Sequence, residues 1–247
     1  MSGTLRDALF RDYREGQGEI SNAASYTDVH AQWPYFEANY GEHFRRLPRT
    51  TDIIEVGPGH GGLLAWLRSL GFERIEGVDA SPGDVQFANS HLGAEIVTLG
   101  DACEFLSARR AAYDVILTKA VLEHVAKNDL FSLLSATAAA LKPGGFVIID
   151  VPNMDWLLAT HERYMDLTHE VGFTRQSLSS LLRLAFDEMS VKGSRIAKPT
   201  RAQRLLRTPM IRLIQAGLYV LGEGADGVLF SNRSLVAVAS KPRVAVR

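Results

Sequence analysis

The sequence has almost no cysteine and no excess of charge of either sign. A single cysteine, Cys103, stands among 247 residues, which excludes an internal disulfide framework and a zinc site built from cysteines. Such cysteine usage favours a reducing, cytoplasmic compartment. The formal net charge is -1, and a chain so nearly neutral gives no electrostatic indication of nucleic-acid binding. Nucleic acid is therefore not expected among its partners.

Long hydrophobic runs are also missing. The most apolar stretch, residues 210–222, is interrupted by Arg212, and a helix that spans a bilayer needs roughly 20 apolar residues. Residues 1–13 carry charged side chains such as Arg6 and Arg11 and lack the apolar centre of a signal peptide. We expect a soluble, cytoplasmic protein, for which contact with a membrane surface stays open.

Short apolar runs alternate with helical patterns through most of the chain. Hydrophobic residues make up 46% of the sequence and charged residues 22%, as in ordinary globular domains. Alternation of this kind predicts βαβ units and an α/β fold with helices on both faces of a mostly parallel sheet. A helical N-terminal extension is expected over residues 1–50, followed by the main domain over residues 51–247. Strands are expected at 53–56, 74–78, 95–99, 113–118, 146–151, 188–196 and 234–240.

Two connections are longer than regular alternation requires, at residues 152–174 and 197–232. Ligands of parallel sheets bind beyond the carboxyl ends of the strands. Both connections leave strands at that edge, so we expect both to overhang the ligand site.

A glycine-rich turn follows the first expected strand, and its glycines let the backbone approach a ligand closely. Gly57, Gly59 and Gly62 also satisfy the dinucleotide fingerprint, so a nicotinamide oxidoreductase is one alternative. Glu55, however, is a poor neighbour for a pyrophosphate and a good one for an ammonium group. Asp79 ends the second strand, where a carboxylate can accept hydrogen bonds from ribose hydroxyls.

Five motifs in order extend this pattern: IIEVGPGHGG, EGVDASP, GDACEFL, YDVILTKAVLEHV and LKPGGFVIID. They resemble the successive motifs of class I S-adenosylmethionine (SAM)-dependent methyltransferases, from about residue 52 to residue 151 and again in the terminal strands. The resemblance implies a Rossmann-like, seven-stranded sheet with an antiparallel last strand, and SAM as the cofactor. It implies that the methionine part contacts Glu55, Gly57, Gly59 and Gly61, the ribose Asp79 beside Ala80, and the adenine Asp101 and Ala102.

Residues for the acceptor are expected in the first long connection. The stretch D-L-T-H-E-x-G-F-T, from Asp166 onward, resembles a segment of bacterial methyltransferases of polysaccharide and other surface-glycan biosynthesis. Transfer of a methyl group to a hydroxyl needs a base, and histidine is poised for this near neutral pH. We expect His169 to act as the base with Asp166 orienting it. His124, Arg163 and Tyr164 are expected to contact the substrate.

Other interpretations of this connection remain open. Thr168 and His169 can instead tie the loop to the core. Four side chains of this connection are of types that bind metal ions, but a metal site is not predicted; they are His161, Asp166, His169 and Glu170. The chain has no Asn-Pro-Pro-Tyr-like tetrapeptide after the fourth strand, which removes the usual reason to expect methylation of a nucleobase or amide nitrogen.

The second connection is basic from Lys192 to Arg212 and then apolar over residues 210–221. Such a segment suits a phosphate-bearing acceptor, a membrane surface or a homodimer contact. The sequence therefore predicts a SAM-dependent methyltransferase that methylates a sugar or glycan hydroxyl. The alternatives are methylation of a quinone, polyketide or other lipophilic metabolite, and a non-catalytic SAM-binding partner subunit.

Overall fold

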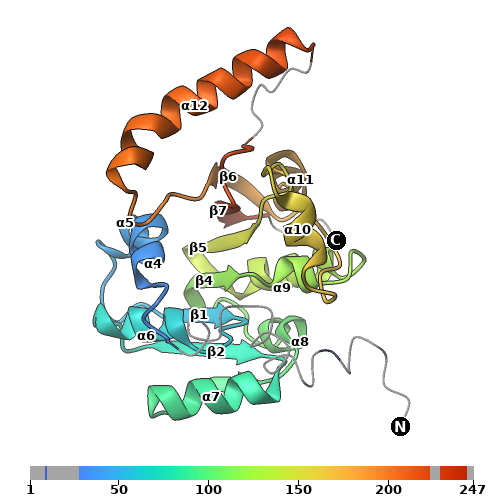
Figure 1. The fold of residues 1–247 in the computed structure, drawn as a ribbon. Helices are drawn as coiled ribbons and strands as arrows, with labels where there is room; N and C mark the ends of the chain where they lie inside the picture. Colours follow the sequence, from blue (N-terminus) through green and yellow to red (C-terminus); the bar gives the residue numbers. More distant parts are fainter. Residues whose placement is uncertain (1–8, 10–27, 223–228, 244–247) are drawn as a thin grey trace.

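A computed structural model describes residues 9, 28–222 and 229–243 of the chain (Figure 1). The expected N-terminal extension over residues 1–50 therefore falls largely outside the described residues, and only its part from residue 28 onward is placed, apart from residue 9. This part forms two short helices, α4 (Trp33–Asn39) and α5 (Gly41–Phe44), which lie beside the central sheet.

The centre of the molecule is a seven-stranded sheet with the order β3-β2-β1-β4-β5-β7-β6. Strands β1 to β5 run parallel, while β7 pairs antiparallel with both β5 and β6. The expected sheet with an antiparallel last strand is confirmed. The strands are β1 (Ile53–Val56), β2 (Ile75–Asp79), β3 (Val97–Leu99), β4 (Tyr113–Lys119), β5 (Leu141–Pro152), β6 (Phe186–Gly193) and β7 (Ser234–Pro242).

The sixth strand departs from its expected bounds of 188–196. Phe186 is fully buried and pairs with Pro242, so the strand begins earlier. Its last pair joins Gly193 to Leu235, and the chain then turns away, with Arg195 donating its backbone N–H to Asn39. Burial of Phe186 therefore sets the start of β6, and the contact with α4 sets its end. The alternation of apolar and polar residues in the sequence does not define either bound.

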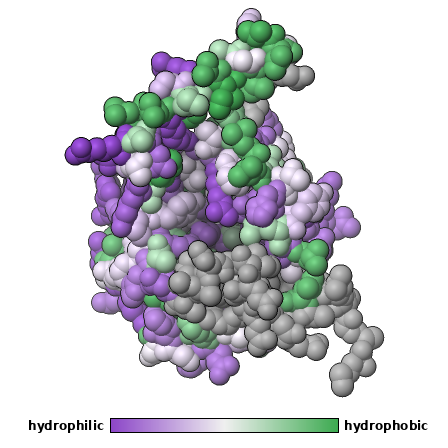
Figure 2. Space-filling view, in the orientation of Figure 1, coloured by the Kyte–Doolittle hydropathy of each residue, from purple (hydrophilic) through white to green (hydrophobic). Residues whose placement is uncertain are grey.

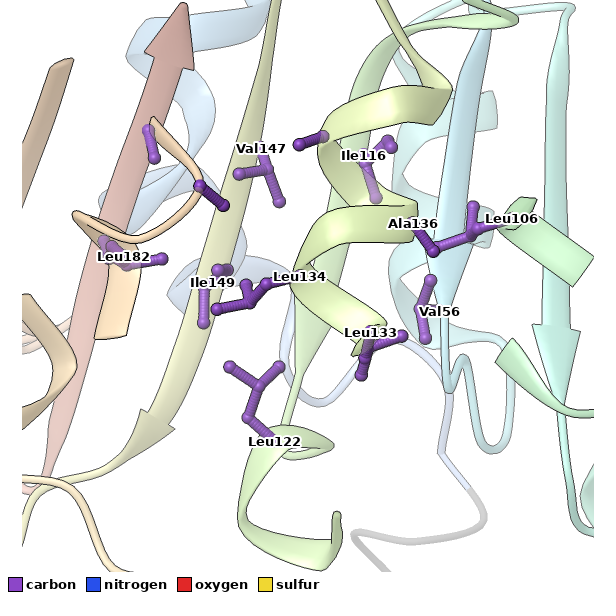
Figure 3. Close-up of a cluster of buried hydrophobic side chains, with 14 of the residues drawn as sticks. Val56, Leu106, Ile116, Leu122, Leu133, Leu134, Ala136, Val147, Ile149 and Leu182 are labelled. Carbon is purple, nitrogen blue, oxygen red and sulfur yellow. The ribbon is translucent and has the colours of Figure 1, made fainter. Parts of the chain in front are cut away.

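Helices cover both faces of the sheet, as expected. One face carries α4 (Trp33–Asn39), α5 (Gly41–Phe44), α6 (Gly62–Ser69) and α7 (Pro82–Leu92). The other carries α8 (Ala102–Ser107), α9 (Leu130–Ala140) and α11 (Arg175–Leu182). On this second face Leu133, Leu134 and Ala136 of α9 belong to one buried cluster with Val56, Ile116 and Ile149 of the sheet, and Leu134 lies beside Ile149 (Figure 3). Burial of such side chains is the main stabilising contribution to the fold.

Local signals explain where the helices begin. Ser81 caps α7 by accepting a hydrogen bond from the backbone N–H of Asp84, and Pro82 occupies the first helical position. Thr174 and Thr200 form capping boxes at the starts of α11 and of the long helix α12 (Arg201–Val220).

The two long connections behave differently. The first contains α10 (Ala159–Tyr164) and returns to the sheet edge through a bridge between Asn153 and Phe173. The second contains α12, which stands away from strands β1 to β4 and has no buried residue (Figure 1). The expectation that the second connection covers the ligand site is therefore not met by α12. No helix among the described residues has the length and apolarity to cross a bilayer.

Candidate active site

The glycine-rich turn after β1 holds three residues at positive φ. A Cβ on Gly57 would lie 2.4 Å from Val121, and one on Gly61 would lie 3.2 Å from Ala88. These two glycines are required by the packing of the fold. Gly59, with φ of +52°, has nothing within 4 Å of its Cβ position, so its absent side chain leaves open space beside the turn.

Asp79 closes β2 and holds this turn in place. Its Oδ2 accepts a hydrogen bond of 3.0 Å from the backbone N–H of Gly59, and its Oδ1 accepts one of 2.8 Å from that of Ser81. Burial raises the pKa of Asp79 to about 6. An ionised carboxylate accepts about four hydrogen bonds, so Asp79 keeps acceptor capacity for ribose hydroxyls. Ala80 lies exposed next to it.

Glu55 is a buried polar group of this region with an oxygen that has no partner among the described residues. Its side chain is 3% exposed, and the oxygen without a hydrogen-bond partner there is Oε2. Burial raises the pKa of Glu55, and the positive charge of Lys119 opposes this rise. A buried acceptor without a partner is rare in folded proteins. The ammonium group of the methionine part of SAM would satisfy it, so the residues present fit this cofactor.

The adenine side is less distinctive. Asp101 is exposed and caps α8 by accepting a hydrogen bond of 3.0 Å from the backbone N–H of Glu104. Helix capping therefore accounts for this carboxylate by itself. Asp101 and the half-buried Ala102 follow β3 at the edge where Asp79 ends β2, and their contact with adenine stays a prediction.

A polar network that the sequence reasoning missed lies at the ends of β4 and β5. Asp150, 3% exposed, accepts a hydrogen bond of 2.6 Å from the Tyr35 hydroxyl and a second from the Tyr40 hydroxyl. Burial raises the pKa of Asp150, while Lys119 and the two tyrosine hydroxyls lower it. In the sequence, an acid inside the apolar run of β5 indicates that a buried carboxylate needs partners. The two tyrosines fit the apolar pattern of a helix, so the sequence does not identify them as those partners.

His124 and Glu123 lie in the one-turn helix after β4 (Leu122–His124). The Thr168 hydroxyl donates to Asp166 Oδ1 over 2.6 Å, and His124 Nδ1 lies 2.7 Å from that hydroxyl oxygen. Because the hydroxyl proton goes to Asp166, His124 Nδ1 is the donor to Thr168. This tautomer carries its lone pair on Nε2.

His169 lies beside His124, with ring centroids 4.8 Å apart. Its Nδ1 donates to the backbone carbonyl of Glu162 over 3.0 Å, so its lone pair is also on Nε2. The expectation that Asp166 orients His169 needs correction: the Glu162 carbonyl holds Nδ1 of His169, while Asp166 acts on His124 through Thr168. The sequence spacing gave no indication of that intermediate hydroxyl.

Arg163 ties this loop together. Its guanidinium donates to the carbonyls of His169 over 2.6 Å and of Glu170 over 3.0 Å. It also lies over the ring of Tyr164, which is 72% exposed. Arg163 therefore has a positioning role in the structure, and substrate contact by Arg163 and Tyr164 remains a prediction.

Among the described residues, one group has the geometry to hold a metal ion. It consists of Glu123, His124 and His169. One ligand atom of each lies within 4.8 Å of the others. Four metal-binding side chain types were noted in the first long connection, and of these residues only His169 belongs to this group. Glu123 is 2% exposed, neither of its carboxylate oxygens has a hydrogen-bond partner among the described residues, and burial raises its pKa to about 8.

An open hollow of about 370 Å³ lies between α5 and β6, lined among others by His43, Lys192 and Arg195. None of the cofactor or acceptor residues described above lines it. We place the active site by its chemistry, at the carboxyl edge of β1, β2 and β4, where buried acids and histidines converge.

Comparison with known proteins agrees with this fold. Residues 29–185 match the model of a methyltransferase domain. The chain belongs to this methyltransferase family. It has the Rossmann-like fold of SAM-dependent methyltransferases.

Curated relatives include ubiquinone biosynthesis O-methyltransferases. The chain is 33% identical over 155 residues to a ubiquinone biosynthesis O-methyltransferase of Chelativorans sp. (strain BNC1), covering 59% of each chain. It is 36% identical over 107 residues to the protein of the same name from Bartonella bacilliformis, covering 42% of each. The chain thus matches less than two thirds of these relatives' length. They give no support to the expected glycan-biosynthesis subtype.

Solved structures support the fold. A SAM-dependent methyltransferase from Archaeoglobus fulgidus aligns with a TM-score of 0.64 at 22% identity, covering 93% of this chain and 99% of that one. A Haemonchus contortus phosphoethanolamine N-methyltransferase, in complex with phosphomonomethylethanolamine and S-adenosylhomocysteine, aligns with a TM-score of 0.61 at 19% identity. It covers 98% of this chain and 61% of the other.

Proposed function

We propose that the protein is an O-methyltransferase that acts on a ring hydroxyl of a lipophilic, quinol-type acceptor. The observation that carries this proposal is the pair His124 and His169, each with Nδ1 engaged as a donor and the lone pair on Nε2. The lone pair on Nε2 of His169 supplies a proton acceptor for a hydroxyl, and His124 lies beside it. The names of the curated relatives support a quinone-like acceptor over a glycan.

The chain's residues would hold SAM at the carboxyl edge. Glu55 would bind the ammonium group, Asp79 the ribose hydroxyls, and the open side of Gly59 would face the cofactor. Bound SAM supplies an electrophilic methyl group.

His169 Nε2 would take the proton of the acceptor hydroxyl as that oxygen is methylated, and the imidazole would hold this proton until it is released to solvent. His124 lines the other side of the hydroxyl, held by Thr168. General-base catalysis of this kind contributes roughly a hundredfold or more in rate.

The test is methyl transfer from isotope-labelled SAM to a quinol that carries a free ring hydroxyl, followed by mass spectrometry. The same ring with that hydroxyl already methylated, and a set of nucleotide sugars, serve as comparison acceptors. We expect label only on the free quinol hydroxyl. Transfer to a nucleotide sugar instead, or to neither class, would refute the proposed acceptor.

The base assignment has a matched control within the same segment. His169→Ala should lower turnover, whereas His161→Ala, which changes an exposed histidine outside the cluster, should not. Equal activity of the two variants would exclude His169 as the proton acceptor.

A further inference from the structure

Helix α12 (Arg201–Val220) exposes an apolar face that no described part of the chain covers. At 3.6 residues per turn, its exposed apolar side chains occupy a continuous arc of about 160°. Figure 2 shows the hydrophobic band along this helix. The arc consists of residues 53% to 83% exposed: Leu205, Leu206, Met210, Leu213, Val220 and, directly after the helix, Leu221.

The neighbouring face of α12 is turned toward the rest of the protein. Arg207, Ile211, Ile214 and Leu218 recur at helical spacing and are half-buried. Arg207 donates to the backbone carbonyl of Ser231 over 3.3 Å and to its hydroxyl over 3.2 Å. This contact fixes which face of the helix points outward, so exposure of the apolar arc follows from the fold.

The third face is basic. Arg201, Arg204 and Arg212 are exposed; Arg201 and Arg212 border the apolar arc, and Arg204 lies further round the helix, next to the half-buried face. Within the described part of the chain none of these three forms an ion pair. Residues 195–222 contain no acid at all. The positive charge of these three arginines is therefore not balanced by an ion pair within the described residues, although the whole chain carries a net charge of only -1.

We propose that α12 docks on the surface of an anionic lipid membrane, with its apolar arc among the acyl chains and its arginines at the level of the head groups. A helix with a large apolar face and an arginine-rich polar face lies in this way in the interface plane. An anionic bilayer matches both faces at once. A second copy of the chain would cover the apolar arc, but it would bring two uncompensated arginine faces together.

This inference goes beyond the proposed function and does not depend on it. Helix α12 lies apart from Asp79, Glu123 and His169, so a variant of its outer face leaves the active site intact. Binding of S-adenosylhomocysteine to each variant therefore checks its fold independently of lipid and acceptor.

The experiment is flotation of the full chain with vesicles of phosphatidylcholine alone and of phosphatidylcholine with phosphatidylglycerol. We expect the protein to float with the anionic vesicles and to stay in solution with the neutral ones. Leu213→Glu, in the middle of the apolar arc, should weaken binding roughly tenfold or more. Leu184→Glu changes an exposed leucine outside α12, just before β6 and at the end of that strand opposite to the one that leads to α12, and should bind like the unmodified chain.

Replacement of Arg201, Arg204 and Arg212 by glutamine should weaken binding to anionic vesicles by roughly a hundredfold. Added salt should also weaken the binding of the unmodified chain. Absence of the unmodified protein from the floating fraction would overturn the proposal. So would equal flotation of Leu213→Glu. A third contradicting result is a dimer of the unmodified chain in sedimentation analysis that Leu213→Glu converts to a monomer, since the arc would then be a contact between copies.

Discussion

The hydroxyl of Tyr40 offers a sharp test of how the N-terminal helices are attached to the sheet. Tyr40 is 1% exposed, and its hydroxyl donates to the carboxyl of Asp150, which is itself 3% exposed. Tyr40→Phe removes this hydrogen bond and keeps the ring, which stacks on Phe36 at a centroid distance of 5.8 Å. The packing of α4 and α5 therefore stays, and the change isolates one polar contact.

Hydrogen bonds to charged groups contribute about 1.5–3 kcal/mol. Because Tyr35 still donates to the same oxygen over 2.6 Å, the expected loss lies toward the lower end, about 2 kcal/mol. The bond lowers the pKa of Asp150, so it favours the ionised carboxylate. The loss should therefore become smaller as the pH falls and Asp150 is protonated in both proteins.

Urea unfolding at several pH values measures this loss. Tyr219→Phe, which removes a hydroxyl that is 80% exposed on α12, is the matched control and should change the free energy of unfolding little. The double variant Tyr35→Phe/Tyr40→Phe should lose more than the sum of the single losses, because Asp150 then keeps neither donor. A loss below about 0.5 kcal/mol for Tyr40→Phe would refute this account of the network.

Three further predictions concern the active site. His169→Ala should lower kcat by about a hundredfold or more in the acceptor assay and leave the affinity for S-adenosylhomocysteine nearly unchanged. The affinity for S-adenosylhomocysteine should fall as the pH drops through about 6, the pKa of Asp79, since only the ionised carboxylate accepts from both ribose hydroxyls. Asp79→Asn should bind weakly and without that pH dependence in calorimetry. Gly59→Ala forces an alanine to φ of +52° and places a methyl group in the open side of the turn. The variant should bind S-adenosylhomocysteine at least tenfold more weakly, while its free energy of unfolding should fall by only about 1–2 kcal/mol. Differential scanning fluorimetry with and without the ligand measures both effects.

Much of the fold follows from local patterns in the sequence. The apolar runs around Ile54, Ile116 and Ile148 predict buried parallel strands, and each is almost fully buried. Ser81 before Pro82 predicts the start of α7, and it caps that helix through Asp84. These features depend only on residues that are close in the chain, so they can be predicted from one sequence.

The parts that were missed depend on long-range contacts. The network of Tyr35, Tyr40 and Asp150 joins residues more than 100 positions apart. The link from Asp166 to His124 runs through Thr168, and the distance between the two histidine rings is set by the loop conformation. Residue types indicated that His169 belongs to the acceptor side, but only the folded chain shows which group holds its imidazole.

Calorimetric titration with S-adenosylhomocysteine, repeated with NADH and with the Asp79→Asn variant, tests the central claim most directly. The account predicts that the unmodified protein binds S-adenosylhomocysteine and not NADH, and that Asp79→Asn loses most of this affinity. Binding of NADH instead, or equal S-adenosylhomocysteine binding by the variant, would contradict the assignment of this sheet edge as a SAM site with Asp79 at the ribose.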